Sequence, residues 1–146
     1  MPSILLDTNL LVYIFDPRDP TQKEKAKEIV QAIENSGFGC LSAQCLAEFF
    51  RVVTVKLRLP PIKIYPVIER WANVFPTFAI TSQVVLEAAR GARDYGLSYY
   101  DAQIWAAARM NQVAVVFSED FQDGQILEGV RFVNPFGADF QLDKWL

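Results

Sequence analysis

Short apolar runs alternate with longer amphipathic segments along this sequence. The first run, Ile4-Leu5-Leu6, has no polar position, which is typical of a strand buried on both faces of a parallel sheet. Similar runs predict further strands at residues 38–41, 78–80, 114–117 and 130–133. Apolar residues at helical spacing between them predict helices over residues 10–15, 21–35, 43–57, 62–74, 84–95 and 99–110.

Polar residues mark where these helices begin. Thr8 or Asn9 is expected to cap the first helix, and Ser42 to cap the helix after the second strand. The spacing of Ser98 and Asp101 is that of a capping box for the last helix. Strands that alternate with helices indicate an α/β fold, in which helices cover both faces of a central, mainly parallel sheet of four to five strands.

The composition predicts a single domain over residues 1–146. Hydrophobic residues make up 51% of the chain and charged residues 21%, and no linker or low-complexity tract interrupts it. No apolar run approaches the roughly 18 residues of a membrane span, and the N-terminus lacks the features of a signal peptide, so we expect a cytoplasmic protein with no membrane partner. Cys40 and Cys45 have no histidine partners for zinc and are expected to be buried thiols.

The chain contains no histidine, which excludes several catalytic classes. Ser-His-Asp and Cys-His catalysis, histidine-based ribonuclease mechanisms and histidine-rich zinc sites all require an imidazole. Acid–base chemistry must then use carboxylates, lysine, tyrosine or water activated by a metal. The net charge of −3 disfavours broad, nonspecific binding of nucleic acid but is compatible with a local basic groove.

Four carboxylates occupy positions that surface solubility does not explain. Asp7 ends the first strand and Asp120 follows the most apolar later strand, so both are expected at the ligand-binding edge of the sheet. Asp101 lies on the otherwise apolar face of its helix, and Glu48 is the only charge between positions 42 and 50. Taken singly, Asp101 is equally explained as a helix cap, and Glu48 as the solvent edge of its helix.

Together, the four acids indicate a metal site. Carboxylates that converge without basic partners repel one another and raise each other's pKa unless a divalent cation neutralises them. Mg²⁺ and Mn²⁺ prefer oxygen ligands and commonly act beside substrate phosphates. The expected chemistry is hydrolysis of a phosphodiester by a water that the cation activates, and this chemistry requires no histidine.

Four motifs resemble those of the PIN-domain nucleases, in the same order along the chain. They are LLDTNLLVY at residues 5–13, Glu48, YDA at residues 100–102 and SEDF at residues 118–121. The ending, from FQDG at residues 121–124 to VNPF at residues 133–136, further resembles the VapC toxins of prokaryotic type II toxin–antitoxin modules. The resemblance covers nearly the whole chain. It implies a PIN-like three-layer α/β/α sandwich and an endoribonuclease, a hydrolase that cleaves RNA phosphodiesters with Mg²⁺ or Mn²⁺.

The resemblance also implies a role for each matching residue. Asp7, Glu48 and Asp101 match the three core acidic positions, as catalytic residues and metal ligands. Asp120 matches the fourth position, although Glu119 competes for that role. As partners, the resemblance implies a second copy in a homodimer and a VapB-like antitoxin whose C-terminal segment wraps the toxin near its acidic site. Supporting polar positions beside the acids are matched by Thr8, Asn9 and Ser118.

Basic and aromatic residues outside these motifs are candidates for contacts with RNA. Arg90 and Arg93 share one predicted helix, and Tyr99 and Tyr100 open the next. Either the basic residues form solvated helix edges, or some of them line an RNA groove in which a tyrosine stacks on unpaired bases. A second basic group surrounds the Pro60-Pro61 turn and consists of Arg51, Lys56, Arg58 and Lys63.

Two other functions are compatible with the residues alone. A phosphatase would use Asp7 as a covalent nucleophile, but such enzymes usually carry a second acid two residues later, where this chain has Asn9. A catalytically inactive module would keep the acidic pocket and sequester RNA or a protein partner. Binding of RNA without cleavage would distinguish the module from the nuclease.

Overall fold

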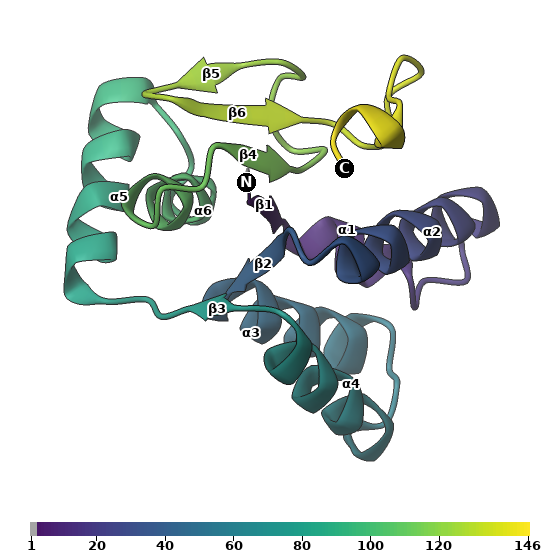
Figure 1. Cartoon of the computed structure of the whole chain (residues 1–146). Helices are drawn as coiled ribbons and strands as arrows, with labels where there is room; N and C mark the ends of the chain where they lie inside the picture. The colour runs from purple at the N-terminus through teal and green to yellow at the C-terminus, as the bar shows by residue number, and fades with distance from the viewer. Residues whose placement is uncertain (1–2) are drawn as a thin grey trace.

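A twisted sheet of six strands forms the centre of the molecule in the computed structural model, which describes residues 3–146. Residues 1 and 2 of the expected domain lie outside the described residues. In chain order the strands are Ile4–Leu6 (β1), Gly39–Ser42 (β2), Thr77–Phe78 (β3), Val115–Phe117 (β4), Ile126–Leu127 (β5) and Val130–Val133 (β6). They stand in the order β3-β2-β1-β4-β6-β5, and within this sheet only β5 is antiparallel to its neighbour (Figure 1).

The described part of the chain holds six α-helices. They are Thr8–Tyr13 (α1), Pro20–Ser36 (α2), Ala43–Arg51 (α3), Pro61–Val74 (α4), Ser82–Tyr95 (α5) and Tyr99–Met110 (α6). A π-helical turn, Val52–Lys56, extends α3, and a 3₁₀ turn, Leu142–Lys144, lies close to the C-terminus. No helix in residues 3–146 combines the length and the apolar character that crossing a bilayer requires.

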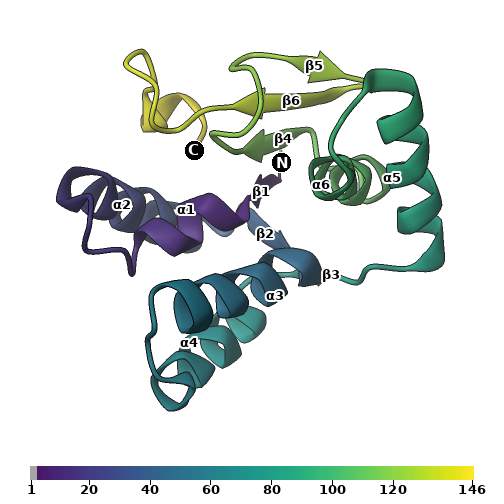
Figure 2. The ribbon, with the colours of Figure 1, turned by 180° about the vertical axis from the view of Figure 1, so that it is seen from behind.

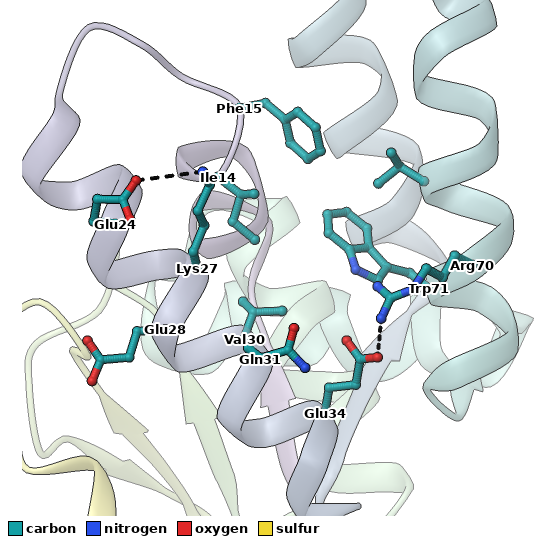
Figure 3. A pocket seen from close by; sticks show the side chains of 11 residues that line it. Ile14, Phe15, Glu24, Lys27, Glu28, Val30, Gln31, Glu34, Arg70 and Trp71 are labelled. Atoms are coloured by element: carbon teal, nitrogen blue, oxygen red, sulfur yellow. Dashed lines mark hydrogen bonds and ion pairs between the residues drawn. The ribbon is translucent and has the colours of Figure 1, made fainter.

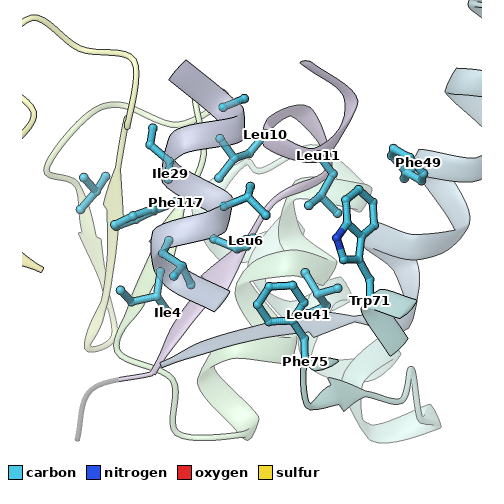
Figure 4. Close-up of a cluster of buried hydrophobic side chains, with 14 of the residues drawn as sticks. Ile4, Leu6, Leu10, Leu11, Ile29, Leu41, Phe49, Trp71, Phe75 and Phe117 are labelled. Carbon is cyan, nitrogen blue, oxygen red and sulfur yellow. The ribbon is translucent and has the colours of Figure 1, made fainter. Parts of the chain in front are cut away.

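Two apolar clusters lie on opposite faces of the sheet. Successive residues of β1 divide between them, because side chains alternate along a strand. Ile4 and Leu6 join the cluster formed with α1 to α4 (Figure 4), and Leu5 joins the cluster beneath α5 and α6. The view from behind shows α5 and α6 on the side of the sheet away from α1 to α4 (Figure 2). The three-layer α/β/α arrangement predicted from the sequence is therefore confirmed.

The register of β1 brings distant parts of the chain to one edge. This strand lies between β2 and β4, with Leu5 paired to Cys40 on one side and Leu6 paired to Phe117 on the other. Because the two neighbours run parallel to β1, the residues that follow all three strands meet at the same edge of the sheet. Asp7 is the first residue after β1, and its N–H donates to Phe117 O at 3.0 Å.

The thiols of Cys40 and Cys45 are buried and unpaired, as expected from the sequence. Burial raises the pKa of each thiol to about 12, so both stay protonated and unreactive near neutral pH. Their role is therefore packing, within the cluster beneath α5 and α6.

Helix starts differ from the sequence prediction at two places. Asp7, rather than Thr8 or Asn9, caps α1, because its carboxylate accepts from the Thr8 N–H at 2.7 Å. At α6 the expected capping box is not formed, since Ser98 makes no side-chain cap bond. Its hydroxyl instead acts on the Asp101 carboxylate, whose pKa it lowers.

Two further differences concern element length and number. The helix predicted over residues 43–57 changes to π-helical geometry at Val52, where Leu57 N–H donates to Val52 O at 3.1 Å. Four successive β-branched residues, 52–55, favour this change because they lower α-helical propensity. The sheet also gains β5, whose two residues are too short to leave a periodic signal in the sequence.

Candidate active site

The three residues after β1 direct polar side chains to two distant parts of the chain. Asp7 is the single residue between β1 and α1, and Thr8 and Asn9 begin α1; these three residues are called the Asp7 turn below. Their side chains make hydrogen bonds to α3 and to the segment that follows β4. One short turn therefore links the two neighbours of β1 at the carboxyl edge of the sheet.

Asp7 is the most enclosed acid of this group, with an exposed fraction of 4%. Its Oδ1 accepts from Thr8 N–H, and its Oδ2 accepts from the Ser118 hydroxyl, both at 2.7 Å. Burial raises the pKa of Asp7 to about 7, although these two hydrogen bonds lower it, and the charges of Asp120 and Asp101 raise it further. An ionised Asp7 is thus costly without a nearby positive charge.

Glu48 is held by a hydrogen bond at each carboxylate oxygen. The Thr8 hydroxyl donates to Oε2 at 3.1 Å, and Gln44 Nε2 donates to Oε1 at 2.9 Å. Gln44 Nε2 also lies 3.1 Å from Tyr100 O, and Gln103 Nε2 donates to Gln44 Oε1 at 2.7 Å. The two amides form a buried chain from α6 to α3 that restricts the position of Glu48.

Sequence reasoning missed this pair of glutamines. Gln44 lies one helical turn before Glu48, and Gln103 lies two residues after Asp101 among buried apolar positions. Both are polar side chains on faces that the helical period assigns to the core, which is the signal that would have found them. That signal does not say which partners satisfy them.

Asp120 and Glu119 point to different partners. Asn9 Nδ2 donates to Asp120 Oδ2 at 3.0 Å, and Asp120 N–H donates to the Ser118 hydroxyl at 3.1 Å. Glu119 instead accepts from the Tyr13 hydroxyl at 2.8 Å, and this contact contributes to raising the pKa of Tyr13 to about 12. Of the two acids, Asp120 is the one that lies beside the Asp7 turn.

Asp101 completes the acidic group from the first turn of α6. Its side chain is partly buried, and burial is the largest cause of its raised pKa, with a smaller lowering by Ser98. The negative charges of Asp120 and Glu48 raise the pKa of Asp101 as well. Asp7, Asp101 and Asp120 therefore influence one another's charge, and Glu48 is linked to them through Asp101 and through its hydrogen bond to Thr8.

The chemistry of this group fits a divalent cation. Residues 3–146 hold no cluster of three or more Asp, Glu, Cys or His side chains already arranged around a metal position. The donors are nevertheless all oxygens, which Mg²⁺ and Mn²⁺ prefer. Within the same residues Asn9 Oδ1 is buried without a hydrogen-bond partner, an acceptor that a cation or its hydration water would satisfy. A positive charge would also favour the ionised form of Asp7, whose pKa is raised by burial and, to a smaller extent, by the charges of Asp120 and Asp101.

Two arginines proposed for an RNA groove are engaged elsewhere. Arg90 pairs with Glu87 and Glu128, and its guanidinium lies 5.3 Å from the ring centroid of Trp105. Arg93 pairs with Asp94. Arg90 thus joins α5 to α6 and to the turn between β5 and β6, whereas Arg93 pairs within α5. Acids accompany both arginines, which favours the interpretation that they form helix edges over contact with phosphates.

A hollow of about 620 Å³ lies away from these acids, between α2 and α4 (Figure 3). Its floor is apolar and includes Phe15, Val30 and Trp71, with the ring centroids of Phe15 and Trp71 6.2 Å apart. An ion pair between Arg70 and Glu34 bridges its two helices. None of the four acids lines this hollow.

Comparison with known proteins identifies the family. Residues 4–122 match the family model of the PIN domain. The chain belongs to the PIN-domain family. The resemblance drawn from the four motifs of this PIN domain is therefore confirmed. No curated protein sequence gives a significant match.

Solved structures share the PIN fold at low sequence identity. A toxin–antitoxin complex from Klebsiella pneumoniae matches 92% of this chain and 98% of its own chain, with a TM-score of 0.67 and 19% identity. VapC20 from Mycobacterium tuberculosis, a sarcin–ricin loop cleaving toxin, matches 88% of this chain and 99% of its own, with a TM-score of 0.69 and 19% identity. DNA-bound VapBC from Salmonella typhimurium matches 90% of this chain and 97% of its own chain, with a TM-score of 0.61 and 20% identity.

Proposed function

We propose that this PIN-domain protein is an endoribonuclease that hydrolyses phosphodiesters of unpaired RNA with Mg²⁺ or Mn²⁺. The observation that carries the proposal is the Asp7-Thr8-Asn9 turn, which joins Glu48 of α3 to Ser118 and Asp120 after β4. Asp101 faces the same group from α6. A chain without histidine can hydrolyse a phosphodiester with this set of acids.

In this proposal Asp7, Glu48, Asp101 and Asp120 hold the cation. Once bound, the cation supplies an activated water and neutralises charge on the phosphate. The surrounding polar residues keep the acids in place: Ser118 holds Asp7, and Thr8 holds Glu48. Restricting these carboxylates matters because in-line displacement tolerates little error in the position of the reacting groups.

Asn9 and Asp120 distinguish this proposal from a phosphatase. Asn9 occupies the place where such an enzyme carries its second acid, and its amide donates to Asp120. Asp120 rather than Glu119 is assigned as the fourth acid, because Glu119 is turned to Tyr13. The electrostatic contact of Asp120 with Asp7 and Asp101 supports the same assignment.

The test is cleavage of an unpaired RNA by the purified full chain. We expect no cleavage in EDTA and recovery on adding excess Mg²⁺ or Mn²⁺, because the acids repel one another without a cation. A double-stranded RNA of the same sequence serves as control and should be cut far more slowly. RNA that is bound but never cleaved under either ion would replace the nuclease with the inactive binding module.

We also propose that the protein acts as a VapC-like toxin in the cytoplasm, with a VapB-like antitoxin as its partner. Two of the solved structures that share its fold are a toxin–antitoxin complex and a DNA-bound VapBC. A homodimer is supported by apolar residues left at the surface near the start of α4, since Val55 is 59% exposed and Ile62 is 82% exposed. Co-expression with the gene that adjoins this one tests the antitoxin.

Gln44→Met is predicted to weaken metal binding. Methionine keeps the length of the side chain but removes the donor to Glu48 Oε1, and loss of such outer-shell partners typically costs about 10- to 100-fold in metal affinity. We expect the Mn²⁺ concentration for half-maximal cleavage to rise about tenfold or more. Gln31→Met, on the solvent side of α2, is the matched control. An unchanged metal dependence in Gln44→Met would show that the amide chain does not position Glu48.

A further inference from the structure

A second hollow, of about 810 Å³, opens directly beside Glu48 between α3 and α6. Its volume falls within the roughly 300–1,000 Å³ of small-ligand sites. Glu48 itself contributes to the wall, so the hollow is continuous with the acidic group. Its full lining is Gln44, Ala47, Glu48, Arg51, Val52, Tyr100 and Gln103.

Arg51 supplies an uncommitted positive charge to this hollow. It lies three residues after Glu48 on α3, so both side chains emerge on neighbouring positions of one helix face. Within residues 3–146 Arg51 has no ion pair, in contrast to Arg90 and Arg109 on α5 and α6, which are paired with acids. A guanidinium without an ion pair can bind an anionic group, such as a phosphate, and hold it next to the acids.

Tyr100 supplies an exposed aromatic face. Its side chain is 64% exposed, and its ring meets Tyr99 edge-on, with the ring centroids 5.6 Å apart. The backbone of Tyr100, not its side chain, makes the bond to Gln44. The ring is therefore not required by the packing of the site, which leaves it available for stacking.

Gln103 adds a polar group in the wall of the hollow. Its Nε2 donates to Gln44, while its Oε1 accepts no hydrogen bond from the described residues. A carboxamide of this kind can read the edge of a nucleobase. The hollow thus combines a cation, an aromatic face and an amide next to a phosphodiester-cleaving group.

We infer that this hollow binds one unpaired nucleotide of the substrate, adjacent to the phosphate that is cut. Arg51 contacts the neighbouring phosphate, the base stacks on Tyr100, and Gln103 contacts the base edge. The inference rests on the proposed ribonuclease function and adds a substrate-binding site to it. It predicts a preference for unpaired RNA, because a paired base must first give up its pairing and stacking to enter the hollow.

The test measures binding separately from cleavage. A fluorescently labelled, unpaired oligoribonucleotide is titrated with the full chain in EDTA, so that it is not cut. We expect Tyr100→Ala to raise Kd by about 5- to 150-fold, the range found for loss of one stacked base, and Tyr100→Phe to bind like the original chain. Arg51→Ala should raise Kd at least severalfold. Arg131→Ala is the matched control, since Arg131 is exposed on β6 and does not line this hollow.

The outcomes separate this inference from the function on which it rests. Metal-dependent cleavage by the original chain, with unchanged Kd and cleavage preference in Tyr100→Ala and Arg51→Ala, would overturn the nucleotide site and leave the nuclease intact. Weakened RNA binding in these variants without any cleavage by the original chain would support the nucleotide site and overturn the nuclease. If the two variants lose affinity for the antitoxin but not for RNA, the hollow is a protein-binding site and the inference is wrong.

Discussion

Asp7→Asn is expected to reduce RNA cleavage at least about 1,000-fold while leaving the fold intact. The substitution keeps the shape of the side chain and an oxygen for the Thr8 N–H, so the cap of α1 is retained. It removes the negative charge at the centre of the acidic group, and metal sites contribute several kcal/mol of charge stabilisation to hydrolysis. The measurement is the single-turnover cleavage rate in saturating Mn²⁺, with circular dichroism to check the fold.

Asp123→Asn is the matched control for this variant. Asp123 is an exposed acid that accepts from Asn134 N–H at 2.9 Å, and it contacts none of the four acids. It should cleave at the original rate, because asparagine preserves the acceptor. Full activity in Asp7→Asn would contradict the proposed mechanism, since no other acid of the site is so enclosed.

The layers of this fold can be predicted from the sequence because apolar runs and helical periodicity are local patterns. The apolar run at residues 4–6 and the helical period of residues 21–35 and 99–110 predict elements that the structure contains at nearly the same bounds. Burial on both faces leaves these strands with no polar position, and that pattern distinguishes a central strand from an edge strand. The two-residue strands β3 and β5 carry too few residues for any period, so their bounds or existence escape prediction.

The acids themselves were predictable, whereas their supporting contacts were not. Asp7 and Asp120 stand out because they follow apolar strands, and Glu48 because it is a lone charge. The bonds from Thr8 to Glu48 and from Asn9 to Asp120 span 40 and 111 positions of sequence, respectively. The first depends on how α3 packs against α1, and the second on the pairing of β1 with β4. No local pattern contains that information.

The partners of the basic residues could not be predicted from the sequence either. Charge alone made Arg51 and Arg90 equivalent candidates for RNA contact. Packing separates them, because Arg90 lies between Glu87 and Glu128 while Arg51 borders the hollow beside Glu48. The partner of a long, flexible cation is set by tertiary structure, so counting charges along a sequence cannot assign it.

In the absence of metal, the protein is predicted to become less stable as pH rises from 5 to 8. The pKa of Asp7 is about 7 in the folded chain and 3.8 in the ordinary, unfolded state. Between these two values the folded state binds more protons than the unfolded state, so the stabilisation is complete below pH 3.8 and is lost as pH rises through 7. At 1.36 kcal/mol per pKa unit, the full loss is about 4 kcal/mol.

Urea unfolding in EDTA at several pH values between 5 and 8 measures the part of this loss that falls above pH 5, about 3 kcal/mol, and Asp7→Asn removes its cause. At pH 8 the variant should therefore be more stable than the original chain by up to about 4 kcal/mol, and the two should converge as pH falls. Asp16, paired with Arg18, has a pKa lowered to about 2 and is ionised in both states across this range, so it adds no slope. Adding Mn²⁺ should stabilise the original chain more than the variant, because the variant lacks the charge of one of the four proposed ligands. If the variant is instead less stable than the original chain at pH 8 in EDTA, the ionised form of Asp7 stabilises the fold without a metal. Burial and like charges would then not require a cation at this edge of the sheet.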